Sequence, residues 1–319
     1  MKIFSGIQPT NQLHIGNYLG AIKQWLSLQK DNECLFCIVD LHALTVPYEP
    51  SSLKKKVLQV ALAYVASGIN PQKSIIFTQS HVKEHSELNW LLSTITPLGD
   101  LERMTQFKDK SKKHKTNINA GLLNYPVLMA SDILLYQTEL VPVGQDQKQH
   151  VELARNLAQK FNNRFGETFR VPKSYIPKLG AKIMSLKEPL KKMSKSDSKD
   201  TFISLFDSPQ EIKKKIMTAK TDSGKEIKYE PKRKPGLSNL LTIYSLFSEQ
   251  PIKKIESKFK NKGYKELKES LTELLTKELK PFREKREKEL EKVLKNGAKR
   301  AEKIAKQTMR KVKKNMGLT

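Results

Sequence analysis

The first half of the chain alternates short apolar runs with segments of helical periodicity, and this alternation restricts the fold more than any other feature. The apolar runs lie at 3–7, 35–39, 74–78 and 140–143. Helical patterns lie between and after them, at 17–29, 53–66, 84–95, 126–136 and 147–161. Strands that alternate with helices form βαβ units, whose crossovers make neighbouring strands parallel. The sequence therefore predicts an α/β fold built on a mainly parallel sheet.

The second half has a different pattern, which predicts a second domain. Pro172, Pro177 and Pro189 punctuate the chain after Arg170, and a polar stretch at 191–200 indicates a mobile connector. From Ser208 onward only helical periodicity remains, interrupted by a loop at 222–235. A chain of 319 residues has room for roughly two domains with their own cores. We expect an all-helical C-terminal domain.

The charge of the chain suggests a polyanionic partner but does not establish one. Lys plus Arg is 59 and Asp plus Glu is 33, a formal excess of +26. Nucleic acid is the first candidate for such a chain. However, only nine of the 59 cations are arginine, and a general lysine bias would give the same excess. The predicted helices at 280–314 carry fifteen basic and five acidic residues, and both RNA contact and a solvated face remain open for them.

Neither a membrane segment nor a cysteine site is expected. The chain has no run of about 18 apolar residues, and its N-terminus lacks the apolar core of a signal peptide. Cys34 and Cys37 are its two cysteines, and they lie in an apolar run typical of a buried strand. Residues three apart on a strand face opposite sides, which disfavours a shared metal or a disulfide. We expect a cytoplasmic protein without a membrane partner.

A polar turn and a helix start follow the first apolar run, and their residue types suit a phosphate. The residues are Gln8-Pro9-Thr10 and, after a short loop, His14-Ile15-Gly16-Asn17. The N–H groups at a helix start attract an anion, Gly16 lets a ligand approach the backbone, and His14 and Asn17 can donate to phosphate oxygens. Taken alone, these residues are more typical of an ordinary capped helix with a surface histidine.

The polar connector contains a second candidate phosphate element, Lys192-Met193-Ser194-Lys195-Ser196. Two lysines on a flexible loop flanked by serine can close over a polyphosphate and release it afterwards. In a chain so rich in lysine the string also arises by chance. Its weight comes from its occurrence together with the first element.

Together the two elements resemble those of the class I aminoacyl-tRNA synthetases, which carry a HIGH-type motif after the first strand of a Rossmann-type sheet and a KMSKS loop after the last. Asn17 stands at the last histidine of HIGH and keeps a neutral donor, as in the branch that activates tyrosine or tryptophan. Three further strings are similar to the bacterial tryptophanyl-tRNA synthetases, and the similarity extends from Lys2 to Gly317. They are Phe4-Ser5-Gly6-Ile7-Gln8-Pro9, Glu102-Arg103-Met104-Thr105-Gln106-Phe107-Lys108 and Val143-Gly144-Gln145-Asp146-Gln147-Lys148-Gln149-His150.

A carboxylate in an apolar helix is the candidate for amino-acid selection. Tyr125, Met129, Asp132 and Tyr136 are spaced to share one helix face. An ionised aspartate only accepts hydrogen bonds and an indole N–H only donates, while a methionine packs well on an aromatic ring. Asp132 is also a candidate helix cap, but apolar residues on both sides favour a position inside the helix. We interpret Asp132 as the indole reader, which would reject phenylalanine because the carboxylate would be left buried and unpaired.

The resemblance implies ligand contacts at specific positions. Gly144 and Asp146 would meet the ATP ribose, and Ile183 the adenine. The other ATP contacts would be Gln8, Pro9, Thr10, Gly16, Asn17, Gln145, Lys192, Met193, Ser194, Lys195 and Ser196. Gln147 would bind the amino-acid head, and the remaining tryptophan contacts would be Phe4, His42, Tyr125, Met129 and Asp132, with Val143 as a further wall. Lys110 is the candidate for an additional phosphate contact.

The resemblance also implies a reaction and an organisation. L-tryptophan and Mg-ATP would give tryptophanyl-adenylate and pyrophosphate, and the aminoacyl group would pass to the terminal adenosine of tRNA(Trp). His14, Asn17, Lys192 and Lys195 would be catalytic, with Mg²⁺ carried by ATP rather than by protein side chains. A homodimer is implied, with a Rossmann-type catalytic domain at 1–206, an inserted segment at about 104–183, and a helical domain at 207–319 that binds the tRNA anticodon.

Two alternatives to this function remain open from the sequence. A relative that activates tyrosine is one, because Asp132 would also pair with a phenol hydroxyl. A nucleotide-binding and RNA-binding paralogue without ligase activity is the other. The intact His14, Lys192, Lys195 and Gln147 argue against such a loss of activity.

Overall fold

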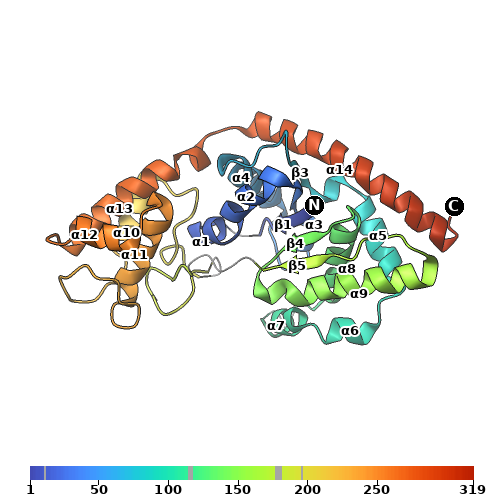
Figure 1. The fold of residues 1–319 in the computed structure, drawn as a ribbon, viewed down its shortest axis with the longest axis horizontal. Helices are drawn as coiled ribbons and strands as arrows, with labels where there is room; N and C mark the ends of the chain where they lie inside the picture. The colour runs from blue at the N-terminus through green and yellow to red at the C-terminus, as the bar shows by residue number, and fades with distance from the viewer. Residues whose placement is uncertain (11, 114–117, 177–181, 195–196) are drawn as a thin grey trace. The chain divides into compact units, whose positions relative to one another are not determined.

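A computed structural model of the chain describes residues 1–10, 12–113, 118–176, 182–194 and 197–319 (Figure 1). The chain divides into two compact units. The first unit contains residues 1–10, 25–178 and 286–319, and the second contains residues 11–24 and 179–285. This division differs from the boundary predicted at 206, because residues 11–24 and 179–206 group with the helical unit while 286–319 group with the sheet.

A five-stranded parallel sheet forms the centre of the first unit. The strands are β1 (Lys2–Ile7), β2 (Glu33–Ile38), β3 (Ile75–Thr78), β4 (Leu140–Pro142) and β5 (Lys173–Tyr175). Their order is β3-β2-β1-β4-β5, so the sheet grows in one direction from β1 to β3 and in the other from β1 to β5. In open parallel sheets, ligands bind where this direction changes, at the carboxyl ends of the strands. The predicted α/β class and parallel sheet are confirmed.

Apolar side chains cover both faces of this sheet. Along β2, Leu35 and Cys37 pack in the large core cluster, while Phe36 stacks on Trp25 with ring centroids 4.9 Å apart. Both cysteines are buried and unbonded, as the strand pattern predicted. The helices of the unit are α2 (Lys23–Asp31, which starts in the second unit), α3 (Asp40–Ala43), α4 (Pro50–Ala66), α5 (Glu84–Ser93), α6 (Leu98–Glu102), α7 (Thr105–Lys113), α8 (Ala120–Leu134), α9 (Lys148–Phe165) and α14 (Glu287–Met316), with short 3-10 turns at Gln79–His81 and Gln145–Gln147.

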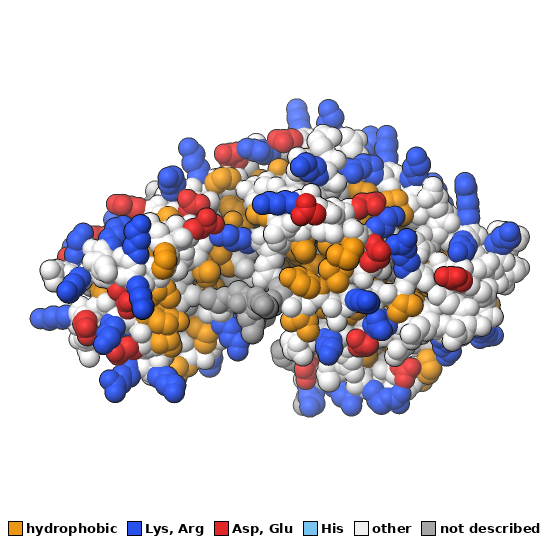
Figure 2. All heavy atoms as spheres, viewed as in Figure 1, with side chains coloured by type: hydrophobic (Ala, Val, Ile, Leu, Met, Phe, Trp, Pro, Cys, Tyr) orange, Lys and Arg blue, Asp and Glu red, His pale blue; other side chains and the backbone are white. Residues whose placement is uncertain are grey.

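The long helix α14 packs against β3, the strand at one edge of the sheet. Its buried residues recur every three or four positions, and the small ones (Gly297, Ala298, Ala301, Ala305) lie together in the middle of the helix. At Gly297 the two backbones are so close that a Cβ atom would lie 1.8 Å from the carbonyl oxygen of Ile76. Lysine and arginine side chains project along the outer side of α14 (Figure 2).

The substitution Gly297→Ala is expected to destabilise the chain by about 2 kcal/mol, because α14 must move away from β3 to make room for the methyl group. A matched control is Gly20→Ala, since nothing lies within 4 Å of the Cβ position there. Thermal unfolding of the two variants measures the difference. Equal melting temperatures would show that α14 does not need its close approach to Ile76.

The second unit is helical apart from its loops and contains the His14–Asn17 part of the HIGH-type element. Its helical segments are α1 (Ile15–Asn17), a π-helical turn (Tyr18–Ile22), α10 (Pro209–Met217), α11 (Pro235–Ser248), α12 (Ile252–Lys258), α13 (Tyr264–Glu278) and a 3-10 turn (Lys280–Arg283). Leu240, Leu241 and Leu271 are among its buried core residues. Tyr18 stacks on Phe247, with ring centroids 5.9 Å apart, and this contact joins the π-helical turn to α11.

Several elements differ in extent from the sequence prediction. β5 was not predicted, because Lys-Ser-Tyr carries no apolar alternation. Together with β4 it shows that the segment predicted as an insertion, 104–183, contributes two strands to the sheet. The helix predicted from Pro126 begins at Ala120 and includes this proline in its interior. No helix in the described part of the chain is both long and apolar enough to cross a membrane.

Candidate active site

Asp132 lies inside α8, as predicted, and is only 1% exposed. Three side chains from other elements reach its carboxylate. His42 Nε2, from α3, lies 2.8 Å from Oδ2. On the other oxygen, Gln79 Nε2 donates to Oδ1 at 2.7 Å and His85 Nδ1 lies 2.6 Å from the same atom. Asp132 is therefore the centre of a buried polar cluster, and the alternative that it caps a helix is wrong.

The surroundings of Asp132 favour its ionised form. Burial raises the pKa of this carboxyl, but the adjacent His42 and His85 outweigh burial and hold the pKa below its ordinary value. An ionised carboxylate accepts hydrogen bonds and donates none. Asp132 is thus a buried acceptor, as an indole reader requires.

Two of the three donors come from the carboxyl ends of neighbouring strands. His42 lies on α3, which begins just after β2, and Gln79 begins the turn that follows β3. These ends lie side by side because β2 and β3 pair in parallel, with Ile38 opposite Thr78. The strand topology thus explains how residues distant in the sequence meet at Asp132.

The other predicted tryptophan contacts lie in the same unit. Tyr125 is buried in α8, and its hydroxyl lies 2.9 Å from Nε2 of His150. His42 and Tyr125 are edge to face, with ring centroids 6.2 Å apart. Met129 and Val143 are partly buried against the core cluster that contains Phe4. The Phe4 ring stacks on Tyr136 at 5.7 Å, so it also supports the polar cluster from the sheet side.

The turn after β4 is exposed, and two of its side chains are hydrogen-bonded to each other. Gly144 precedes a 3-10 turn at Gln145–Gln147, and the Gln147 side-chain amide donates to Asp146 Oδ2 at 2.9 Å. A Cβ atom at Gly144 would lie 2.8 Å from Asp146 Oδ1. Glycine therefore allows the Asp146 carboxylate to approach the backbone, at the strand end where a nucleotide was predicted.

In the second unit, His14 caps α1 reciprocally with Asn17. His14 Nδ1 accepts from Gly16 N at 3.1 Å, and the Asn17 side-chain oxygen accepts from His14 N at 3.1 Å. The cap predicted as the alternative to a phosphate contact is therefore present. In the neutral imidazole, an acceptor Nδ1 leaves the proton on Nε2. Capping and donation to an anion consequently use different nitrogen atoms of His14.

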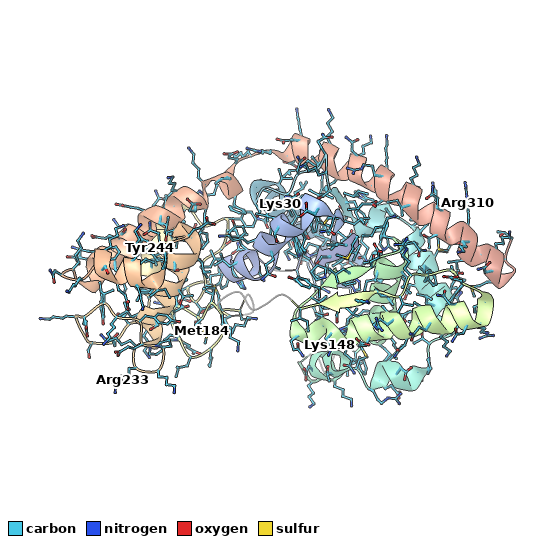
Figure 3. All side chains as sticks on the ribbon, in the orientation of Figure 1. Lys30, Lys148, Met184, Arg233, Tyr244 and Arg310 are labelled. Carbon is cyan, nitrogen blue, oxygen red and sulfur yellow. The ribbon has the colours of Figure 1, made fainter. Side chains whose placement is uncertain are left out.

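The KMSKS-like element starts from a hydrogen-bonded segment of the same unit. Met184, labelled in Figure 3, forms an antiparallel bridge with Lys192. Met193 N donates to Ile183 O at 3.0 Å, and both of these side chains are buried. Asn239 of α11 makes two hydrogen bonds of 2.9 Å to the Met184 backbone. The stretch predicted as a polar connector is thus tied to the helical unit at its start.

The predicted contacts fall into two groups, one in each compact unit. The unit with the sheet holds Phe4, Gln8, Pro9, Thr10, His42, Tyr125, Met129, Asp132 and the Gly144–Gln147 turn. The helical unit holds His14, Gly16, Asn17, Ile183, Lys192, Met193 and Ser194. Lys195 and Ser196 lie outside the described residues, as does the side chain of Lys110.

Sequence reasoning missed Gln79 and His85, which both contact Asp132 directly. A usable signal was present for Gln79, because it is the first polar side chain after a predicted strand, as Gln8 is after the first. His85 gave no comparable signal, since a histidine in the first turn of a helix is common on solvated faces. The structure buries it completely, against Phe77 and Tyr136.

The fold and these residues match one protein family. The family described as tRNA synthetases class I (W and Y) matches residues 1–280. The chain therefore belongs to the class I tRNA synthetases of the tryptophan and tyrosine branch.

The relatives and solved structures that match this chain over nearly its full length include several tryptophan enzymes. A tryptophan–tRNA ligase from Caldanaerobacter subterraneus subsp. tengcongensis is 53% identical over 99% of this chain and 98% of its own. Its counterpart from Bacillus subtilis is 48% identical over 99% and 97%. Tryptophanyl-tRNA synthetase from Campylobacter jejuni, solved with ADP and tryptophan, superposes with a TM-score of 0.88 at 39% identity and covers 100% of both chains. The Mycoplasma pneumoniae enzyme gives a TM-score of 0.84 at 36% identity, over 100% of this chain and 98% of its own.

Proposed function

We propose that the chain is a tryptophan–tRNA ligase, which activates L-tryptophan with ATP and transfers it to the 3′-terminal adenosine of tRNA(Trp). The observation that carries the choice of amino acid is the buried, ionised Asp132 at the carboxyl edge of the sheet. An acceptor at this place suits the indole N–H of the substrate. Full-length relatives named for the same activity support the proposal.

The first step needs no nucleophile from the protein. A carboxylate oxygen of tryptophan attacks the α-phosphorus of ATP, the bond from that phosphorus to the bridging oxygen breaks, and pyrophosphate leaves. The enzyme contributes position and charge stabilisation, as in phosphoryl transfer generally. His14 would donate from Nε2, since its Nδ1 holds Gly16 N. Asn17 would donate from its NH₂ group, since its oxygen holds His14 N.

The lysines of the KMSKS-like element would follow the leaving group. Lys192 is exposed and lies next to the buried Met193, so the backbone is anchored while the ammonium group stays accessible. Lys195 is assigned the same role by family resemblance. Mg²⁺ bound to ATP would neutralise phosphate charge. The nitrogen donors assigned here suit phosphate oxygens, so the ligands of the ion would be phosphate oxygens and water.

Pyrophosphate exchange with each of the twenty amino acids tests the proposal. Purified protein with Mg-ATP is expected to exchange label with tryptophan alone and without tRNA. Exchange with tyrosine would keep the phosphate chemistry and overturn the assignment of Asp132. A complete lack of exchange would favour the paralogue that only binds nucleotide and RNA.

The tRNA and dimer assignments extend the same proposal. The helical residues 207–285 and the basic outer side of α14 are the surfaces we assign to tRNA, in a cytoplasmic enzyme. For the homodimer, Trp90 on α5 is 70% exposed and Leu98 at the start of α6 is 59% exposed. We assign the subunit contact to these two exposed apolar side chains, which would leave water in a dimer.

Trp90→Glu is expected to convert the dimer to a monomer, because a charge would be buried at the interface without a partner. Sedimentation velocity at equal protein concentration measures the change. Leu190→Glu is the control, since Leu190 is 80% exposed in the other unit. A Trp90→Glu variant that still sediments as a dimer would place the interface elsewhere.

A further inference from the structure

We infer that His85 and Tyr136 form a positioning relay behind Asp132, and that this relay sets the selectivity for tryptophan. The inference rests on the proposed function. Neither residue was assigned a ligand contact, and both are fully buried. They act through Asp132, so they are positioning residues rather than catalytic ones.

The acceptor positions on Asp132 limit how a substrate can approach it. A carboxylate offers about four, two on each oxygen. Gln79 and His85 fill both positions on Oδ1, whereas His42 fills one on Oδ2. Among the described residues, this leaves one position on Oδ2, beside His42, for a substrate N–H. The cluster therefore determines which oxygen the indole meets and from which direction.

Hydrogen bonds at both nitrogens fix the ring of His85. Because ionised Asp132 only accepts, His85 must donate from Nδ1. The other ring nitrogen, Nε2, lies 2.7 Å from the Tyr136 hydroxyl. His85 therefore links the Tyr136 hydroxyl to Asp132 through its two ring nitrogens. An imidazole with both nitrogens engaged has a fixed orientation, as metal-bound and catalytic histidines have.

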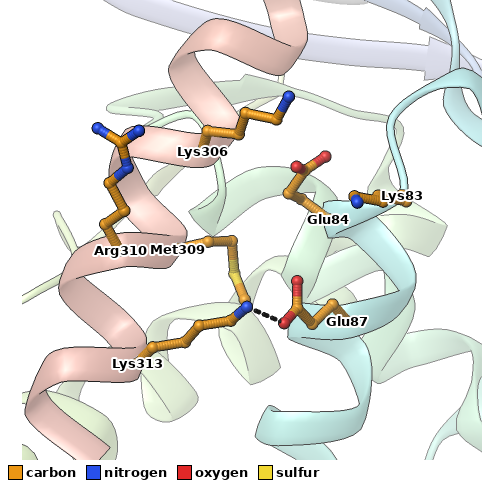
Figure 4. A pocket seen from close by; sticks show the side chains of 7 residues that line it. All are labelled: Lys83, Glu84, Glu87, Lys306, Met309, Arg310 and Lys313. Atoms are coloured by element: carbon orange, nitrogen blue, oxygen red, sulfur yellow. Dashed lines mark ion pairs between the residues drawn. The ribbon is translucent and has the colours of Figure 1, made fainter. Parts of the chain in front are cut away.

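Both residues of the relay are packed against other elements. Tyr136 stacks on Phe4 with an interplanar angle of 9° and meets the edge of Phe77 at a centroid distance of 5.6 Å. On α5, the residue before His85 is Glu84, which faces a cavity of about 510 Å³ between α5 and α14 (Figure 4). Lys313 of α14 forms an ion pair with Glu87 across this cavity (Figure 4). Helix α14 thus contacts α5 at the turn of the helix that carries His85.

Tyr136→Phe removes only the hydroxyl and tests the relay. Without it, His85 loses its second anchor and Oδ1 of Asp132 loses its fixed donor. We expect the KM for tryptophan in pyrophosphate exchange to rise about tenfold, with kcat and the KM for ATP nearly unchanged. Tyr64→Phe is a matched control, because Tyr64 is equally buried and its hydroxyl donates to Cys37 O at 3.1 Å, outside the cluster.

A second experiment distinguishes an effect on the position of Asp132 from a general loss of stability. In a chain that already carries Asp132→Asn, Tyr136→Phe is expected to have no further effect on the KM for tryptophan. Equal effects of Tyr136→Phe and Tyr64→Phe on this KM, or full additivity with Asp132→Asn, would overturn the relay. The unsubstituted enzyme is measured in the same assay. Absence of exchange with tryptophan there would refute the proposed function, whereas normal exchange with insensitive variants would refute the relay alone.

Discussion

Replacing Asp132 by asparagine is expected to raise the KM for tryptophan by about a hundredfold, the equivalent of about 2.8 kcal/mol. The substitution keeps the shape of the side chain but puts an NH₂ group where an oxygen was. His42, Gln79 and His85 all approach this side chain as donors, so an amide cannot satisfy them and the indole together. Such a donor facing a donor in a buried site costs more than a missing hydrogen bond.

The measurement is pyrophosphate exchange at varied tryptophan and saturating ATP. The KM for ATP is expected to change by less than about threefold, because the nucleotide contacts that we propose lie on other elements. An unchanged KM for tryptophan would remove Asp132 as the reader of the indole.

The same variant reports on stability, because the pKa of Asp132 is lowered in the folded chain. Its ionisation therefore stabilises the fold above the unfolded pKa of about 4, and this contribution is lost as the pH falls through the lower folded value.

Substitution of His14 is expected to give the largest loss of rate, about a hundredfold to a thousandfold in kcat for adenylate formation. The structure assigns its Nδ1 to the cap of α1. His14→Ala removes both the cap and the Nε2 donor, so it should lose rate and also about 1 kcal/mol of stability. His14→Asn keeps a side-chain oxygen that can cap the helix. It should lose rate alone.

Comparing the two variants decides between the capping and the phosphate interpretations of His14. Single-turnover adenylate formation gives the rate, and thermal unfolding gives the stability. If His14→Asn is as fast as the unsubstituted chain, the imidazole is only a helix cap. If both variants are slow but only His14→Ala melts early, the two nitrogen atoms have the separate functions assigned to them.

Local sequence patterns were sufficient to predict the parallel sheet and the position of Asp132 inside a helix. Four of the five strands carry short apolar runs that alternate with helical patterns, and a carboxylate inside an apolar helix must have buried partners. That His42, Gln79 and His85 meet at Asp132 was not predictable, because they come from three elements whose meeting depends on the order of the strands. β5 was missed for a different reason. Its three residues are exposed or half-buried, and its backbone pairing with β4 leaves no trace in residue type.

The division of the chain was the least predictable feature. Helical periodicity at 287–316 is the same whether the helix packs on the helical unit or on the sheet. Gly297 is the residue that indicates packing on the sheet, since only a glycine permits the contact with Ile76. A single glycine in a lysine-rich helix, however, makes no distinctive sequence pattern. Residues 11–24 likewise continue into α2, so nothing local marks the change of unit at residue 25.

The packing of α14 on β3 has a consequence for synthesis on the ribosome. The strand β3 is translated early, whereas the helix that packs against it is translated after every other described element. During elongation, the backbone groups of this strand are therefore open to pairing with strands of other nascent chains. A product released before α14 would keep that exposed edge and be a target for aggregation and proteases. Only a chain translated through α14 can therefore cover this edge strand.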